Sequence, residues 1–123
     1  MDKHKTEQEQ FWAGNFGDEY TIRNSGIRTI SANVALFSRI IARTKGVKIC
    51  LELGANRGLN LIALSRLMPD LKMQAVEITK SAASECAKIT NVKVYNGSAF
   101  DFPAEEGAFD LTLIDRLWIC LPP

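Results

Sequence analysis

A strand-like run that passes through a glycine loop into a helical pattern constrains this chain more than any other feature. The apolar run 47–53 suits a buried parallel strand, and it is followed by Gly54 and then Gly58. From Leu59 onward, leucine and isoleucine recur at helical spacing. Glycine lets the backbone approach a ligand closely, and the first turn of a helix offers unpaired N–H groups. The junction therefore predicts a site for a nucleotide-like ligand at the end of a strand.

The spacing within this loop narrows the choice of motif. A dinucleotide fingerprint needs glycine in place of Asn56, and a phosphate loop needs Lys-Ser/Thr after Gly58. The remaining pattern, E-x-G-x-x-x-G, resembles motif I of the class I S-adenosylmethionine (SAM) dependent methyltransferases. That resemblance implies SAM as the cofactor, S-adenosylhomocysteine (SAH) as its product, and Glu52 near the methionine part. The cofactor-binding residues it implies in the loop are Glu52, Gly54, Ala55, Asn56 and Gly58.

Strand and helix patterns alternate along the rest of the chain. We expect strands at 47–53, 71–78, 91–95 and 109–114, and helices at 27–44, 59–68 and 79–89. Ser25 is the expected N-cap of the first helix, and Gly46 follows its end. A strand, a helix and a strand within about thirty residues predict a right-handed βαβ unit. The methyltransferase resemblance implies a Rossmann-like, three-layer αβα fold with a mostly parallel sheet in the order 3-2-1-4.

Acidic and hydroxyl side chains follow the second and third expected strands. Glu77 ends the second strand beside Ile78, where a carboxylate accepts hydrogen bonds from both hydroxyls of a ribose. The alternative is a surface glutamate without a partner. The resemblance implies that the turn after the third strand, with Ser98 and Ala99, addresses adenine. Either Ser98 or Asp101 reaches the adenine ring, or Asp101 only caps the following turn, and the sequence leaves this choice open.

The N-terminal segment has two interpretations. Residues 1–10 are polar and predict a frayed start or a loose helix, whereas 11–24 hold four aromatic side chains and two glycines. This second stretch is either a hydrophobic flap over the core or a lid over a ligand. As a lid, it would place Tyr20 or Arg23 on the carboxylate of the ligand, because arginine binds that group with two donors.

The motif W-A-G-x-F-G-x-E-Y-x-x-R-N in this segment favours the lid. It resembles the N-terminal signature of the pseudaminic acid biosynthesis-associated methylases, a bacterial family found with genes for surface-glycan sugars. The resemblance implies cofactor contacts from Trp12, Tyr20 and Arg23. We therefore expect one domain over 1–123, with a lid segment at 1–26 and a partial Rossmann-like core at 27–123.

The fourth expected strand begins with Phe-Asp-Leu at 109–111, which is similar to motif IV of the same superfamily. Asp115 is the acid near the end of this strand and is our candidate general base. The pattern then departs from the family, because Cys120 stands where a histidine is expected and two prolines follow. The family fold has seven strands, so the chain predicts a truncated relative. Its fourth-strand edge and the apolar patch 117–119 predict self-association, unless the tail folds back over the edge.

Composition limits the partners of the chain. Fifteen basic and 14 acidic residues give a net charge of +1, and no basic stripe predicts a nucleic-acid partner. No apolar run approaches the roughly 20 residues of a membrane span, so we expect a cytoplasmic protein. The three cysteines lack metal-ligand spacing, which predicts reduced thiols and no metal site.

The sequence thus predicts methyl transfer from SAM to a sugar or a nonulosonic-acid-type small molecule. The alternative is a catalytically inactive SAM-binding module that acts through association. A third class, the NAD-linked Rossmann domain, is disfavoured by Asn56 in the glycine fingerprint and by Glu52 at the start of the loop.

Overall fold

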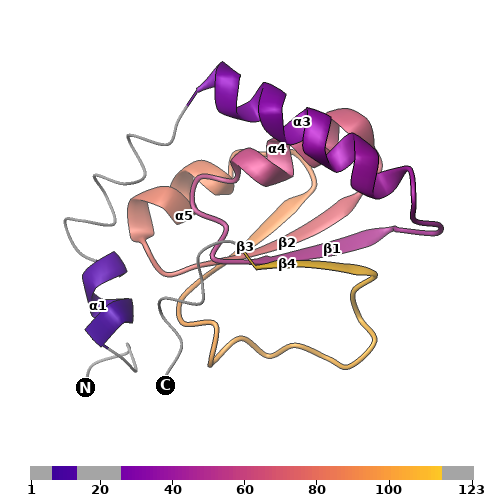
Figure 1. Cartoon of the computed structure of the whole chain (residues 1–123). Helices are drawn as coiled ribbons and strands as arrows, with labels where there is room; N and C mark the ends of the chain where they lie inside the picture. Colours follow the sequence, from indigo (N-terminus) through magenta and orange to yellow (C-terminus); the bar gives the residue numbers. More distant parts are fainter. Residues whose placement is uncertain (1–6, 14–25, 115–123) are drawn as a thin grey trace.

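The computed structural model of the chain describes residues 7–13 and 26–114 (Figure 1). Strands and helices alternate through most of this region, as expected for the α/β class. The elements are α1 (Glu7–Ala13), α3 (Ile27–Ile41), β1 (Ile49–Leu53), α4 (Leu59–Leu67), β2 (Lys72–Glu77), α5 (Lys80–Cys86), β3 (Val92–Asn96) and β4 (Leu111–Ile114).

The four strands form one parallel sheet in the order β3-β2-β1-β4, which confirms the predicted order. In its central row, Cys50 of β1 lies opposite Met73 of β2 and Leu111 of β4. All strands run in the same direction, so their carboxyl ends meet at one edge of the sheet. That edge is where ligands bind in open α/β sheets.

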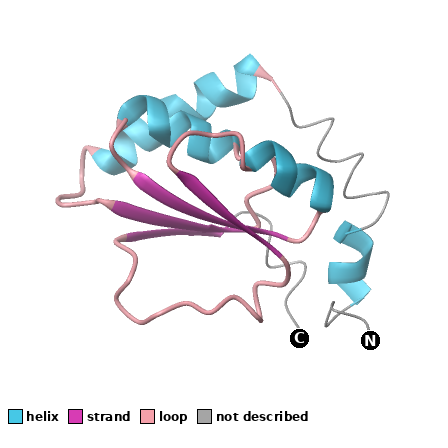
Figure 2. Cartoon of the chain, turned by 180° about the vertical axis from the view of Figure 1, so that it is seen from behind, coloured by secondary structure: helices cyan, strands magenta, loops and turns pink. Residues whose placement is uncertain are grey.

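Helices α3, α4 and α5 lie on one face of this sheet, and the long connection 97–110 runs along the other side (Figures 1 and 2). The second helical layer that the resemblance implied is therefore absent from the described residues. The connection from β3 to β4 contains Pro103 between Gly97 and Gly107, and these residue types disfavour a helix. In place of a helix, Phe102 of the connection packs on Tyr95 of β3, with ring centroids 5.4 Å apart, and on Phe109 at 6.4 Å.

The core lies between the sheet and the three helices. Phe37 of α3 and Leu61 and Leu64 of α4 pack in one cluster with Cys50 and Met73 of the sheet. Leu61 and Leu64 are fully buried, and burial of each such side chain contributes roughly 1.5–3 kcal/mol. Helix α3 also contacts α4 directly. This packing fixes the start of α4, and with it the glycine loop, over the carboxyl end of β1.

Two helices are shorter than predicted. Helix α3 ends at Ile41 instead of 44, because the N–H groups of Arg43 and Thr44 turn back to the carbonyls three residues earlier. Helix α5 ends at Cys86 instead of 89, because the N–H group of Ile89 likewise turns back to the carbonyl of Cys86, three residues earlier. The other bounds agree with the predictions within two residues.

The cap of α3 also differs from the prediction. Gly26, with φ 149°, occupies the N-cap position that we assigned to Ser25, and no side chain caps this end. Ser25 itself lies outside the described residues. No described helix has the length and hydropathy needed to cross a bilayer.

Candidate ligand site

The candidate site is the edge where the carboxyl ends of β1, β2 and β3 meet. The glycine loop 54–58 connects β1 to α4 and turns back over the end of β2. The N–H groups of Gly54 and Ala55 both donate to the Val76 carbonyl, at 2.8 and 3.1 Å. These two hydrogen bonds fix the loop against β2.

Three residues of the loop have left-handed backbone angles. Gly54, Asn56 and Gly58 have φ values of 76°, 54° and 83°. Asparagine adopts this conformation more readily than other residues with a side chain, which explains Asn56 at the middle glycine position of the fingerprint. The conformation directs the Asn56 N–H group to the carboxylate of Glu77. The side-chain Oδ1 of Asn56 is buried and has no hydrogen-bond partner among the described residues.

Gly58 has a packing role that the sequence did not reveal. A Cβ at this position would lie 2.5 Å from Ile89 Cδ1 and 2.9 Å from Cys86 Sγ. A side chain at Gly58 would therefore require the Ile89 and Cys86 side chains to shift, and it would also have to adopt the left-handed backbone angle. We had attributed both glycines of the loop to close approach of a ligand. At Gly58, the structure provides a second reason within the protein itself.

Glu77 is a buried carboxylate at the end of β2, with only 7% of its surface exposed. Its Oε1 accepts a hydrogen bond from the Asn56 N–H group, and its Oε2 accepts one from the Thr79 N–H group, both at 2.7 Å. Burial raises the pKa of Glu77, and these hydrogen bonds oppose the rise. The alternative of a surface glutamate without a partner is therefore wrong. The carboxylate is fixed in position, and a carboxylate offers about four acceptor sites.

Glu52 is the second buried carboxylate of the site, with no exposed surface. Its Oε2 accepts a hydrogen bond of 2.6 Å from the side-chain amide of Asn60, in the first turn of α4. The Oδ1 of Asn60 in turn accepts one of 2.8 Å from Asn33 of α3. Sequence reasoning missed both asparagines. The one signal was their polarity at helix positions where neighbouring residues are apolar.

The turn after β3 is tied to the end of β2. Asn96 Nδ2 and the Gly97 N–H group both donate to the Glu77 carbonyl, at 2.9 and 3.1 Å. Ser98 is buried, and its Oγ accepts a hydrogen bond of 3.1 Å from the Phe100 N–H group. Asp101 is exposed. The structure thus brings Ser98 close to the end of β2 and leaves the choice between Ser98 and Asp101 open.

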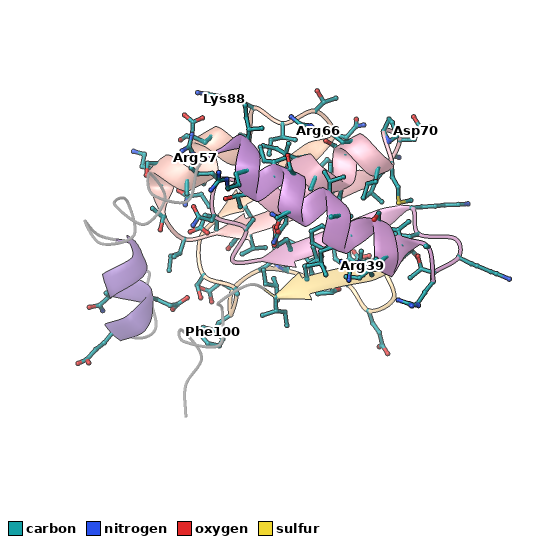
Figure 3. All side chains as sticks on the ribbon, turned by 45° about the horizontal axis from the view of Figure 1, so that its top comes forward. Arg39, Arg57, Arg66, Asp70, Lys88 and Phe100 are labelled. Carbon is teal, nitrogen blue, oxygen red and sulfur yellow. The ribbon has the colours of Figure 1, made fainter. Side chains whose placement is uncertain are left out.

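Ile78 and Ala99 lie at the same edge and are half-buried. Arg57 of the loop lies beside α5 (Figure 3), where its guanidinium is 4.0 Å from the Glu85 carboxylate. Phe100, which follows Ala99, is exposed on the connection after β3 (Figure 3).

The charges of both buried carboxylates raise the pKa of one thiol. Burial, and after it the charges of Glu52 and Glu77, raise the pKa of Cys86 to about 12. Burial and Glu52 raise the pKa of Cys50 to about 12 as well. Both thiols are free and buried. Among the described residues, no group of three or more metal-ligating side chains gathers at one place.

Four predicted site residues are not characterised by the structure. Tyr20, Arg23 and Asp115 lie outside the described residues. Trp12 belongs to α1, but its side chain is also outside the described part. Their roles stay predictions.

The fold is similar to that of several solved methyltransferases. The plantazolicin methyltransferase BpumL, in complex with SAH, has a TM-score of 0.63 and 17% identity over 87% of this chain and 44% of its own. The sugar N-methyltransferase KedS8 from Streptoalloteichus sp ATCC 53650 has a TM-score of 0.59 and 22% identity over 84% and 40%. CalS10, an amino pentose methyltransferase from Micromonospora echinaspora with SAM bound, has a TM-score of 0.58 and 16% identity over 81% and 41%.

These similarities show that the chain has the Rossmann-like α/β fold of class I methyltransferases, with the predicted strand order. The chain spans less than half the length of these three proteins. No protein-family model matches the chain, and neither does any curated protein.

Proposed function

We propose that the chain binds SAM and supports transfer of its methyl group to a small-molecule acceptor. The observation that carries this proposal is the Glu77 carboxylate, which the Asn56 and Thr79 N–H groups hold at the carboxyl end of β2. It lies beside a glycine loop in a fold shared with methyltransferases that were solved with SAM or SAH. A carboxylate in this position suits the two hydroxyls of a ribose.

The residues of the site fit such a cofactor. The Glu77 carboxylate accepts backbone N–H groups from Asn56 and Thr79, and the Thr79 side chain and the Ile78 N–H group also bond to it, so ribose hydroxyls would share the carboxylate with these donors. Asn56 Oδ1 is a buried acceptor that a donor of the cofactor would satisfy. In this proposal, Ile78, Ser98, Ala99 and Asp101 surround the adenine ring, and Glu52, Gly54, Ala55 and Gly58 line the rest of the cofactor.

The chemistry asked of the protein is mainly positioning. When bound, SAM supplies a methyl group on a positively charged sulfur, which an aligned nucleophile displaces. The loop and the two carboxylates would fix the orientation of that group, which is the larger part of such catalysis. We assign removal of the acceptor's proton to Asp115, and closure over the cofactor to segment 1–26 with Trp12, Tyr20 and Arg23.

We assign the acceptor to sugars or nonulosonic-acid-type molecules. The N-terminal motif of the pseudaminic acid-associated methylases supports this choice. So do the names of KedS8 and CalS10, which denote methyltransferases of a sugar and an amino pentose. The near-neutral net charge of +1 does not favour a nucleic-acid acceptor, and we assign the chain to the cytoplasm.

A SAM-binding module without catalysis is the second candidate. The observation that favours it is an edge strand in the described sheet, at which a second chain would pair. Strand β4 forms an open edge within the described sheet, and Ile114 on it is 59% exposed. We propose that this edge associates with a second copy. Both candidates bind SAM, but only the enzyme forms SAH in the presence of an acceptor.

Calorimetric titration with SAM and with SAH tests the proposal. Wild type should bind both, and Glu77→Ala should weaken binding by about 100-fold, because two hydrogen bonds to a charged group are lost. Glu85→Ala is the matched control, since Glu85 also contacts the loop residue Arg57 but lies half-exposed on α5. A folded wild type that binds neither ligand would contradict the proposal. Equal affinity of wild type and Glu77→Ala would contradict the ribose role.

A further inference from the structure

A line of three polar side chains runs from α3 through α4 to β1. Asn33 donates to Asn60 at 2.8 Å, and Asn60 donates to Glu52 at 2.6 Å. The second distance is at the short end for an N–H donor to an oxygen, as expected when the acceptor is charged. The three residues come from three different elements, and the line ends at a fully buried carboxylate.

Both ends of the Asn60 amide are used. Its nitrogen donates to Glu52, and its oxygen accepts from Asn33. An isolated asparagine could present either its nitrogen or its oxygen to a neighbour. The carboxylate, which only accepts, selects the Asn60 nitrogen, and the donor from Asn33 to the Asn60 oxygen holds the amide in that orientation. Asn33 therefore acts on Glu52 through Asn60.

Glu52 lies on the strand next to the one that carries Glu77. It is in register with Ala75, two residues before Glu77 on β2, so both glutamates belong to the helix-facing rows of the sheet. Both charges also raise the pKa of the Cys86 thiol. Neighbouring strands lie about 4.8 Å apart, so a ligand that crosses the ends of β3, β2 and β1 meets Glu77 and then Glu52.

We propose that Asn60 and Asn33 are positioning residues that orient the Glu52 carboxylate for the amino-acid portion of SAM. This inference rests on the proposed function, in which adenine lies at β3 and the ribose at β2. The remaining part of the cofactor then lies at β1, and its ammonium group is the natural partner of a fixed carboxylate, directly or through water. A carboxylate with a fixed orientation binds this group at a smaller entropic cost.

Two ligands separate this role from a general structural one. SAH contains adenosine and the amino-acid portion, whereas methylthioadenosine contains adenosine and the sulfur but lacks the amino acid. Calorimetry with both ligands should show that Asn60→Ala weakens SAH binding by about tenfold or more, while methylthioadenosine binding changes less than about twofold. Asn33→Ala should produce a smaller loss with the same selectivity. Ser38→Ala, an exposed change on α3, is the control and should alter neither affinity.

The outcomes distinguish the inference from the function on which it rests. Wild type that binds neither SAH nor methylthioadenosine would overturn both. Wild type that binds both ligands, with Asn60→Ala and Asn33→Ala losing both equally or losing neither, would overturn the positioning role alone. Thermal melting of each variant confirms that it is folded. Asn33→Ala tests the inference even where Asn60→Ala fails to fold, because Asn33 does not contact the carboxylate itself.

Discussion

The ends of β1 and β2 each bury a glutamate, but they hold it by different means. Glu77 accepts chiefly N–H groups of the backbone, from Asn56, Ile78 and Thr79, with the Thr79 side chain as a further donor. Glu52 accepts a side-chain amide, from Asn60. A backbone donor persists when the residue that carries it is substituted, whereas a side-chain donor does not. The end of β2 is therefore defined by the course of the loops, and the end of β1 depends on the identity of residues on two helices.

The loop between the two ends offers the largest test of this contrast. Gly58→Ala would combine a left-handed backbone angle with close contacts to Ile89 and Cys86. The backbone angle should cost about 1–2 kcal/mol of unfolding free energy, and the overpacking about 1–3 kcal/mol more. Gly46→Ala is the matched control, because Gly46 has φ 72° but nothing within 4 Å of its missing Cβ. Urea unfolding of both variants measures the difference.

A cost at Gly58 no greater than that at Gly46 would show that α4 and α5 can separate at this point. The contrast between the two strand ends would then lose its basis, since the loop would not be fixed by packing. Loss of folding in Gly58→Ala, with Gly46→Ala still folded, would strengthen the contrast between the two strand ends.

Alkaline pH should have the next largest effect on stability, through the buried thiols of Cys50 and Cys86. Burial raises the pKa of Cys50 and Cys86 from 9.0 to about 12. The unfolded thiols lose their protons above pH 9 while the folded ones keep them, so stability falls as pH rises from 9 towards 12. The expected loss at pH 10 is about 1.4 kcal/mol for each thiol. Urea unfolding between pH 8 and 10.5 should show a shallower fall in Cys86→Ala.

Titration of the two thiols also tests where the two carboxylates lie. Adding Glu77→Gln should lower the pKa of Cys86 and leave that of Cys50 unchanged, because only Cys86 responds to both carboxylates. The rise of thiolate absorbance with pH in single-cysteine variants would report each value. An equal shift of both thiols would contradict the placement of Glu77.

Acidic pH gives a smaller effect, whose sign differs between two glutamates. Burial raises the folded pKa of Glu77 above 4.5, so its favourable contribution is present below pH 4.5 and is lost as pH rises. Lys88 lowers the folded pKa of Glu85, so its contribution is present above pH 4.5 and is lost as pH falls. Relative to Glu77→Gln, wild type should thus lose stability between pH 4 and 6. Relative to Glu85→Gln, wild type should gain stability as pH rises from about 3 to 4.5, and slopes of equal sign for the two glutamates would refute these assignments.

The open edge beside β1 offers the smallest effect on stability. Ile114 pairs with Leu53 at the end of β1, and it is 59% exposed. Ile114→Ser should change the free energy of unfolding by less than about 0.5 kcal/mol, as is usual for exposed positions. If the edge associates with a second copy, the variant should also weaken self-association in sedimentation experiments. A wild type that stays monomeric at high concentration would rule out that association.

Local patterns predicted the four strands and the position of Glu77 at the end of the second strand, because each of these depends on nearby sequence. The run 47–53 followed by glycine indicates a strand and a turn, and the strand order follows from the family resemblance. Helix ends were less predictable. The end of α3 at Ile41 depends on turn hydrogen bonds that compete with the helix by small energies. The cap at Gly26 involves no side-chain hydrogen bond, and the neighbouring Ser25 offered the stronger sequence signal for an N-cap.

The sequence alone determined the α/β class, the glycine loop and the acid at the end of the second strand, because periodicity and glycine act over a few neighbouring residues. Only the tertiary structure decided that Gly58 is needed for contact with Ile89, and that Asn33 and Asn60 orient toward Glu52. These contacts join residues up to 31 positions apart (Gly58 and Ile89), or 27 (Asn33 and Asn60), and packing of α3, α4 and α5 on one sheet face brings them together. Contacts between residues so far apart produce no periodic pattern in the sequence, since they depend on how whole elements pack.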